Sequence, residues 1–129
     1  MRIEHVAIWT NNLENLKDFY IKFFNGIAGE KYVNTSKKFE SYFLTFNAGA
    51  RLELMTISDI ETLYQSEKGK FVGYAHLAFS VGTKDKVDNL TEVVRSSGIE
   101  VIDGPRYTGD GYYESVILDP DGNRIEITI

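Results

Sequence analysis

The chain repeats itself, and this repeat restricts the possible folds more than any other feature of the sequence. When residues 1–57 are laid over residues 73–129, strings of similar residues coincide. Glu-His-Val-Ala-Ile at 4–8 corresponds to Ala-His-Leu-Ala-Phe at 75–79, and Arg-Leu-Glu-Leu at 51–54 corresponds to Arg-Ile-Glu-Ile at 124–127. Because a sequence repeat usually marks a repeated structural unit, we expect two copies of one module.

Each half contains the same order of predicted elements. An alternating strand comes first, and an amphipathic helix follows it. Asn11 or Asn12 can cap the first helix and Thr83 the second, while Gly26 and Gly98 lie just past the helix ends. The apolar stripes of these helices are predicted to be Leu13, Leu16, Tyr20 and Phe23 in the first, and Val87, Leu90 and Val94 in the second. Strands are expected at 2–9, 30–34, 40–46 and 50–56, and at 74–81, 99–103, 112–118 and 123–129.

This order predicts an α+β protein in which residues 1–129 form one domain of two tandem βαβββ modules. The first module is expected at 1–57 and the second at 73–129, with residues 58–72 as a polar connector. The run Tyr42–Phe46 is most simply a buried strand. The segment 104–113, rich in glycine and tyrosine, is expected to form a hairpin, with a mobile loop over a ligand as the alternative.

Composition excludes several functions. The net charge is −5 and the longest basic run is the pair Lys37-Lys38, so nucleic acid is not an expected partner. The chain has no cysteine, which excludes disulfides, thiolate metal sites and a cysteine nucleophile. No apolar run approaches the length of a membrane span or a signal sequence. These features predict a soluble, acidic, cytoplasmic protein that binds neither nucleic acid nor membrane.

Four residues that can bind metal share one predicted face of the strands. Because side chains alternate along a strand, His5, Glu53, His76 and Glu126 all lie opposite the aliphatic residues of their own strands. A lone strand histidine is usually structural, and a strand glutamate is usually a solvated charge. Both histidines of the chain, however, fall at equivalent positions of the repeat. We therefore interpret the four residues as ligands of one divalent metal ion, Zn²⁺, Ni²⁺, Co²⁺ or Mn²⁺.

At these residues the chain resembles the vicinal-oxygen-chelate superfamily, which includes glyoxalase I, ring-cleaving dioxygenases and fosfomycin-resistance proteins. The resemblance rests on His5, Leu-Glu-Leu at 52–54, Ala-His-Leu-Ala at 75–78 and Asp-Pro-Asp-Gly-Asn-Arg-Ile-Glu at 119–126. It implies paired modules that form a curved, open sheet around a metal cavity. The His-Glu-His-Glu pattern is most similar to that of small bacterial glyoxalase I (lactoylglutathione lyase), usually a homodimer.

The resemblance also implies a reaction. A glyoxalase I-like lyase or isomerase would act on a hemithioacetal, or a similar 2-oxo substrate, by proton transfer through a metal-stabilised enediolate. It assigns the catalytic base mainly to Glu126, with Glu53 as its partner. The alternatives are a thiol transferase, an Fe(II) dioxygenase, or a ligand- or drug-sequestering module without enzyme activity.

Two positions depart from the bacterial lyases. Trp9 and Ile57 stand where those enzymes have an arginine and an asparagine that hold glutathione, so specificity for this thiol is not expected. Trp9 can line a more apolar pocket or fill the core. Arg51 and Arg124, each two residues before a glutamate, can form salt bridges or steer an anionic substrate.

Overall fold

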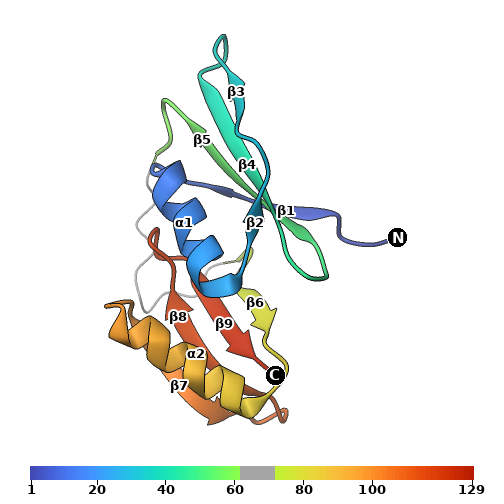
Figure 1. Cartoon of the computed structure of the whole chain (residues 1–129), viewed down its shortest axis with the longest axis vertical. Helices are drawn as coiled ribbons and strands as arrows, with labels where there is room; N and C mark the ends of the chain where they lie inside the picture. The colour runs from blue at the N-terminus through green and yellow to red at the C-terminus, as the bar shows by residue number, and fades with distance from the viewer. Residues whose placement is uncertain (62–71) are drawn as a thin grey trace. The chain divides into compact units, whose positions relative to one another are not determined.

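The computed structural model describes residues 1–61 and 72–129. Its contacts divide the chain into two compact units, Met1–Tyr64 and Gln65–Ile129, each with its own sheet and helix (Figure 1). The fold prediction is confirmed, since the second unit has the βαβββ order and the first has the same order with one additional short strand after its helix. Part of the predicted connector, residues 62–71, lies outside the described residues. None of the helices among the described residues is long and apolar enough to cross a membrane.

The first unit is built on a five-stranded sheet in which the strand order is β1-β5-β4-β2 and β3 also pairs with β4. β1 runs parallel to β5, and β4 is antiparallel to its three neighbours. The strand predicted at 30–34 corresponds to β3, and β2 is an additional two-residue strand that pairs with another part of β4. The elements are β1 (His5–Trp9), α1 (Leu13–Phe24), β2 (Ile27–Ala28), β3 (Tyr32–Asn34), β4 (Phe39–Thr45) and β5 (Arg51–Ile57).

Helix α1 begins and ends at asparagines. The Asn12 side chain accepts a hydrogen bond from the Asn15 backbone N–H at 3.2 Å, which caps the helix as predicted. Asn25, with φ 54°, takes the left-handed conformation at the other end. Gly26 has a different role, because a Cβ there would lie 2.9 Å from a methyl carbon of Leu44. The predicted stripe is buried together with Phe19 and Phe24.

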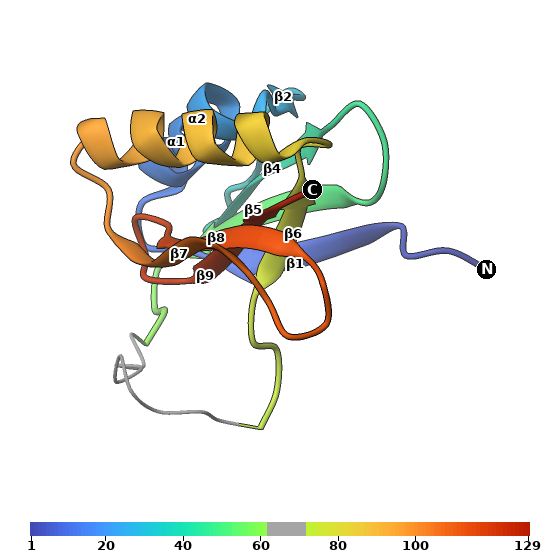
Figure 2. The same cartoon turned by 90° about the horizontal axis from the view of Figure 1, so that it is seen from below.

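The second unit repeats this plan in a four-stranded sheet with the order β6-β9-β8-β7, where β6 is parallel to β9. Figures 1 and 2 show α2 lying along one face of this sheet. Because the helix covers one face, the other face is free to carry the polar residues of the strands. The elements are β6 (Leu77–Ser80), α2 (Lys84–Ser96), β7 (Val101–Tyr107), β8 (Tyr113–Leu118) and β9 (Arg124–Thr128).

Helix α2 buries a polar residue that the predicted stripe omitted. Val87 and Val94 are fully buried as expected, but Leu90 is only half-buried and Thr91 is fully buried. The Thr91 hydroxyl makes this burial possible, because it lies 2.6 Å from both the Val87 carbonyl oxygen and the Ser115 hydroxyl on β8. The prediction of an entirely apolar stripe was therefore wrong at this position.

The segment 104–113 forms a hairpin, which confirms the first of its two predicted forms. β7 continues past its predicted end to Tyr107 and pairs with β8 through a register shift between Asp103 and Arg106. Gly104, with φ +77°, lies in this irregular part, where an added Cβ would be 2.5 Å from the Glu114 carbonyl oxygen. Only glycine fits this close approach of the two backbones.

Candidate metal-binding pairs

The first unit brings His5 and Glu53 together on one face of its sheet. The parallel pairing of β1 with β5 sets Ala7 beside Glu53, so His5 lies one step along the same face. The His5 Nε2 and Glu53 Oε2 atoms are 3.8 Å apart. On the opposite face Leu52 and Leu54 are buried in the core, as the alternation predicted. The Glu53 side chain is 15% exposed, and its carboxylate is therefore accessible but partly desolvated.

The second unit forms the equivalent pair from His76 and Glu126. His76 immediately precedes β6, and its Nε2 atom lies 3.2 Å from the Glu126 Oε2 atom on β9. Ile125 and Ile127 on either side of Glu126 are fully buried, which fixes the face that the glutamate occupies. Each unit thus holds one imidazole and one carboxylate at matching positions.

The turn before β9 helps to place Glu126. Asp119 is buried, and its Oδ1 atom accepts hydrogen bonds from the backbone N–H groups of Asp121 at 3.0 Å and Asn123 at 2.8 Å. Its Oδ2 atom accepts a third hydrogen bond from the Asn123 amide at 2.9 Å. The Asp-Pro-Asp-Gly-Asn string is therefore a turn closed by its first side chain, and it fixes the register with which β9 enters the sheet.

Glu4 contacts His5 of the first pair, and the sequence analysis did not identify it. Its Oε2 atom lies 2.5 Å from His5 Nδ1, and its Oε1 atom accepts a hydrogen bond from Arg51 Nε at 2.8 Å. These bonds, first that with His5 and then that with Arg51, hold the pKa of Glu4 below its ordinary value. The salt bridge also confirms the structural role foreseen for Arg51. One signal could have indicated Glu4: a carboxylate precedes the histidine in the first half, whereas the equivalent position of the second half, 75, is alanine.

Glu114 is a second residue that was not foreseen. In β8 the neighbour Val116 pairs with Glu126, so Glu114 points to the same face as the ligand pair of its unit. Burial raises the pKa of the Glu114 carboxyl, and the negative charge of Glu126 raises it further. The residues 113–118 do not alternate between polar and apolar, so no periodic signal in the sequence indicated this placement. Arg124, at the start of β9, is exposed.

Trp9 does not fill the core. It is 49% exposed on the face that carries His5, and its ring meets Phe39 edge-on with centroids 6.1 Å apart. Ile57 pairs with Phe39 across β4 and β5 and is 37% exposed. The two positions that depart from the bacterial lyases therefore contribute an apolar surface on the same side of the sheet as the first pair.

The run Tyr42–Phe46, of which β4 includes all but Phe46, is only partly buried, which corrects its prediction. Leu44 is fully buried, whereas Phe43 lies on the ligand face and contacts the His5 ring edge-on at 5.4 Å. Tyr42 points to the opposite, helix-bearing face, where its hydroxyl donates to Glu14 at 3.1 Å. Alternation along the strand places Tyr42 and Phe43 on opposite faces of the sheet, and α1 packs on the face that carries Tyr42.

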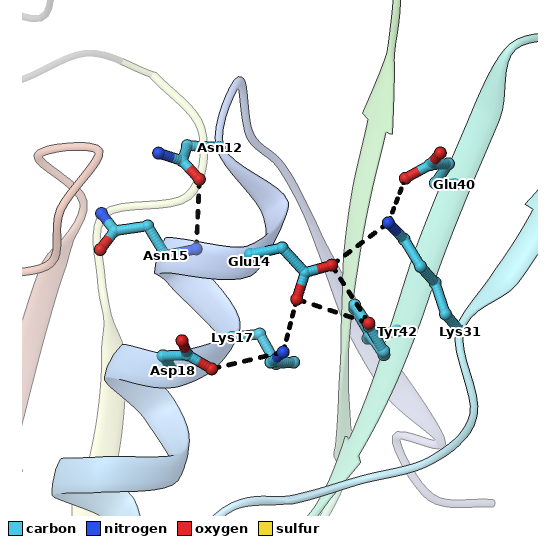
Figure 3. Close-up of polar contacts among 8 residues, drawn as sticks. All are labelled: Asn12, Glu14, Asn15, Lys17, Asp18, Lys31, Glu40 and Tyr42. Atoms are coloured by element: carbon cyan, nitrogen blue, oxygen red, sulfur yellow. Dashed lines mark hydrogen bonds and ion pairs between the residues drawn. The ribbon is translucent and has the colours of Figure 1, made fainter.

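The charged cluster around Glu14 supports the fold and not the site. Figure 3 shows its carboxylate between two lysines, Lys17 at 2.5 Å and Lys31 at 3.2 Å. The hydrogen bond from Lys17 is the main reason that the pKa of Glu14 falls to about 2. Lys31 also pairs with Glu40 at 2.5 Å. The cluster joins α1 to β4 on the face that carries no ligand residue.

Comparison with known proteins agrees with this architecture. The family model of the Glyoxalase/Bleomycin resistance protein/Dioxygenase superfamily matches residues 2–127. The chain belongs to this superfamily. An uncharacterized Bacillus subtilis protein, YqjT, is 26% identical over 129 residues, covering 97% of this chain and 96% of its own.

Two solved structures of superfamily type share the fold. A glyoxylase/bleomycin resistance protein/dioxygenase domain from Frankia sp. EAN1pec aligns with a TM-score of 0.82 at 16% identity, covering 100% of this chain and 97% of its own. The trypanothione-dependent glyoxalase I of Leishmania major aligns with a TM-score of 0.78 at 21% identity, covering 99% of this chain and 86% of its own. At these identities the likeness establishes the fold alone.

The donor chemistry of the two pairs fits the divalent metal that superfamily members commonly bind. Two imidazoles and two carboxylates form an N₂O₂ set that suits Zn²⁺, Ni²⁺, Co²⁺ or Mn²⁺. Within residues 1–61 and 72–129, no three His, Asp or Glu side chains lie close enough together to hold an ion. Each pair by itself supplies two donor groups, one imidazole nitrogen and one carboxylate.

Proposed function

We propose that this chain is a metal-dependent lyase or isomerase of the glyoxalase I type, acting on a hemithioacetal or a similar 2-oxo substrate. The observation that supports this most directly is the pair of matching His–Glu contacts, 3.8 Å in one unit and 3.2 Å in the other. Superfamily membership supports the same reading, and the presence of a glutamate in both pairs favours proton-transfer chemistry.

In this proposal His5, Glu53, His76 and Glu126 hold one divalent ion, with one pair from each module. The modules that meet belong either to one chain or to the two chains of a homodimer, since both arrangements use the same four residues. When bound, such an ion would supply Lewis acidity. Proteins of this fold often form dimers and bind small molecules, which is consistent with either arrangement.

The glutamates carry the proton transfer. Glu126 would take a proton from the carbon next to the substrate carbonyl and return it to the former carbonyl carbon, with Glu53 as the partner carboxylate on the other side. Both side chains are partly shielded from water, with 21% and 15% exposure, which suits groups that must exchange a proton with a carbon acid. The half-buried position also leaves each carboxylate free to contact substrate.

The surface beside the first pair favours an apolar substrate group. Trp9 and Ile57 offer neither the positive charge nor the amide that would hold glutathione, and both are exposed on the ligand face. We therefore expect a preference for hemithioacetals of small or apolar thiols.

Metal content is the first test. Protein purified without chelator should contain about one Ni, Zn, Co or Mn ion per complete ligand set, and His5→Ala and His76→Ala should both lose it. Glu92→Gln is the matched control, because Glu92 is exposed on α2 and pairs with Arg95 away from the ligand face. Absence of tight metal in the unaltered protein would refute the proposal, and bound iron with oxygen uptake would indicate a dioxygenase.

Activity is the second test. Hemithioacetals formed from methylglyoxal and a series of thiols should be isomerised, with the apolar thiols preferred over glutathione. Glu126→Gln should keep most of the metal affinity and lose at least about a hundredfold in rate, the scale of a general base. Equal loss of rate and metal affinity would show that Glu126 is a ligand only.

A further inference from the structure

We propose that Glu4 is a positioning residue that fixes the ring orientation and tautomer of His5. The inference rests on the proposed function only in assigning a metal to the free ring nitrogen. Glu4 precedes β1 and reaches His5 and Arg51 at the same time, through its two different carboxylate oxygens. The equivalent residue of the second unit, Ala75, has no polar side-chain group that could bind a histidine or an arginine.

The hydrogen bond to Glu4 determines which ring nitrogen carries the proton. An ionised carboxylate can only accept, so at 2.5 Å the Nδ1 atom of His5 must be the donor. In a neutral ring Nε2 is then left with its lone pair, and this is the atom that faces Glu53. A metal ligand needs that lone pair, and a carboxylate on the other nitrogen is a common way to present it.

Glu4 is itself held in place, which distinguishes it from an ordinary surface carboxylate. Arg51 binds its Oε1 atom through Nε at 2.8 Å and Nη2 at 2.6 Å. The same guanidinium lies over the Phe43 ring at 4.1 Å, and Phe43 meets the His5 ring edge-on at 5.4 Å. Glu4, Arg51 and Phe43 therefore contact one another in sequence, and Glu4 and Phe43 both contact the His5 ring. Arg51 and Phe43 come from the adjacent strands β5 and β4.

The two histidines of the chain provide an internal comparison. His5 and His76 are equally exposed, at 41%, and each has its Nε2 atom nearest the glutamate of its own pair. Only His5 has a carboxylate on Nδ1. The Nδ1–H tautomer should therefore predominate at His5, whereas the Nε2–H tautomer should predominate at His76, because its Nε2 atom lies 3.2 Å from the Glu126 carboxylate.

The test is ¹⁵N NMR of the imidazole rings in the metal-free full chain near pH 8, where an ordinary histidine is neutral. Glu4→Ala should move His5 toward the Nε2–H tautomer and leave the His76 signals unchanged. Glu4→Gln should retain part of the wild-type pattern, because its amide oxygen still accepts a hydrogen bond from Nδ1. An unchanged His5 tautomer in Glu4→Ala, or equal changes at both histidines, would overturn the proposal.

Zn²⁺ titration followed by calorimetry separates this inference from the proposed function. Glu4→Ala should weaken Zn²⁺ binding about 10- to 100-fold, and Glu4→Gln should recover part of that loss. Failure of the unaltered chain to bind Zn²⁺, with a tautomer that still responds to Glu4, would count against the proposed metal and uphold the orienting role. Tight Zn²⁺ binding that is unaffected by Glu4→Ala would refute the positioning role.

Discussion

The buried hydroxyl pair between α2 and β8 permits a quantitative test of how the second unit is held together. Thr91 and Ser115 are both fully buried, and Thr91 donates its hydroxyl proton to the Val87 carbonyl oxygen. Because Thr91 has one such proton, Ser115 must be the donor in the 2.6 Å contact between them. Thr91→Val thus leaves a buried donor without its acceptor, and we expect a loss of about 2 kcal/mol in unfolding free energy.

Ser115→Ala is the matched control. It removes the donor itself and leaves the Thr91 bond to Val87 intact, so we expect a loss of only about 1 kcal/mol. In the double variant no donor is stranded, and the combined loss should be smaller than the sum of the two single losses by about 1 kcal/mol.

Urea denaturation followed by circular dichroism measures these free energies. The chain has one tryptophan, Trp9 in the first unit, so its fluorescence reports whether that unit responds to a change in the second. The reasoning would be refuted if Ser115→Ala cost as much as Thr91→Val, or if the two losses were additive.

Three further changes test other parts of the structure. Gly104→Ala should cost about 2 kcal/mol or more in urea unfolding, because the added Cβ would lie 2.5 Å from the Glu114 carbonyl oxygen at a positive φ. Glu14→Gln should cost about 0.5 kcal/mol at pH 7, since the carboxylate is half exposed. The stabilisation by Glu14 is complete above pH 4.5, the ordinary pKa of a glutamate, and it disappears as the pH falls toward 2. The unaltered protein and Glu14→Gln should therefore be equally stable below about pH 2. Glu114→Gln should raise the melting temperature at pH 8, because a carboxyl whose pKa is raised by folding costs stability once ionised, and the gain should vanish below pH 4.5.

The features that follow from local periodicity could be predicted from the sequence. The repeat predicted the fold, and alternation placed each of the four ligand candidates on the face opposite the core, because a residue's face depends only on its position within its strand. The helix cap at Asn12 also depends only on its immediate neighbours.

The features that depend on pairing between distant segments could not be predicted. Glu4 acquires its role only when β1 lies beside β5 and brings Arg51 within reach. Thr91 belongs to the core only because Ser115 on β8 supplies a partner for its hydroxyl. β7 continues through Pro105 because the register shift between Asp103 and Arg106 accommodates the proline. The sequence of the segment alone does not indicate that shift.

Comparison of the two units shows which positions tolerate substitution within the core and which polar positions are identical in both units. The buried positions beside each glutamate have exchanged one aliphatic residue for another, Leu52 for Ile125 and Leu54 for Ile127, which packing tolerates readily. The half-exposed histidine and glutamate, and the arginine two residues before the glutamate, are identical in both halves.

Half-exposed positions contribute least to stability and accept the widest range of residues, so packing cannot account for this identity. The residues surrounding each pair differ, since Glu4 and Trp9 of the first unit correspond to alanine and serine in the second. Although the two halves differ at several other positions of this face, they share one imidazole and one carboxylate, and a common task for those two groups would explain this identity. Metal ligation, as proposed above, would use both groups at once.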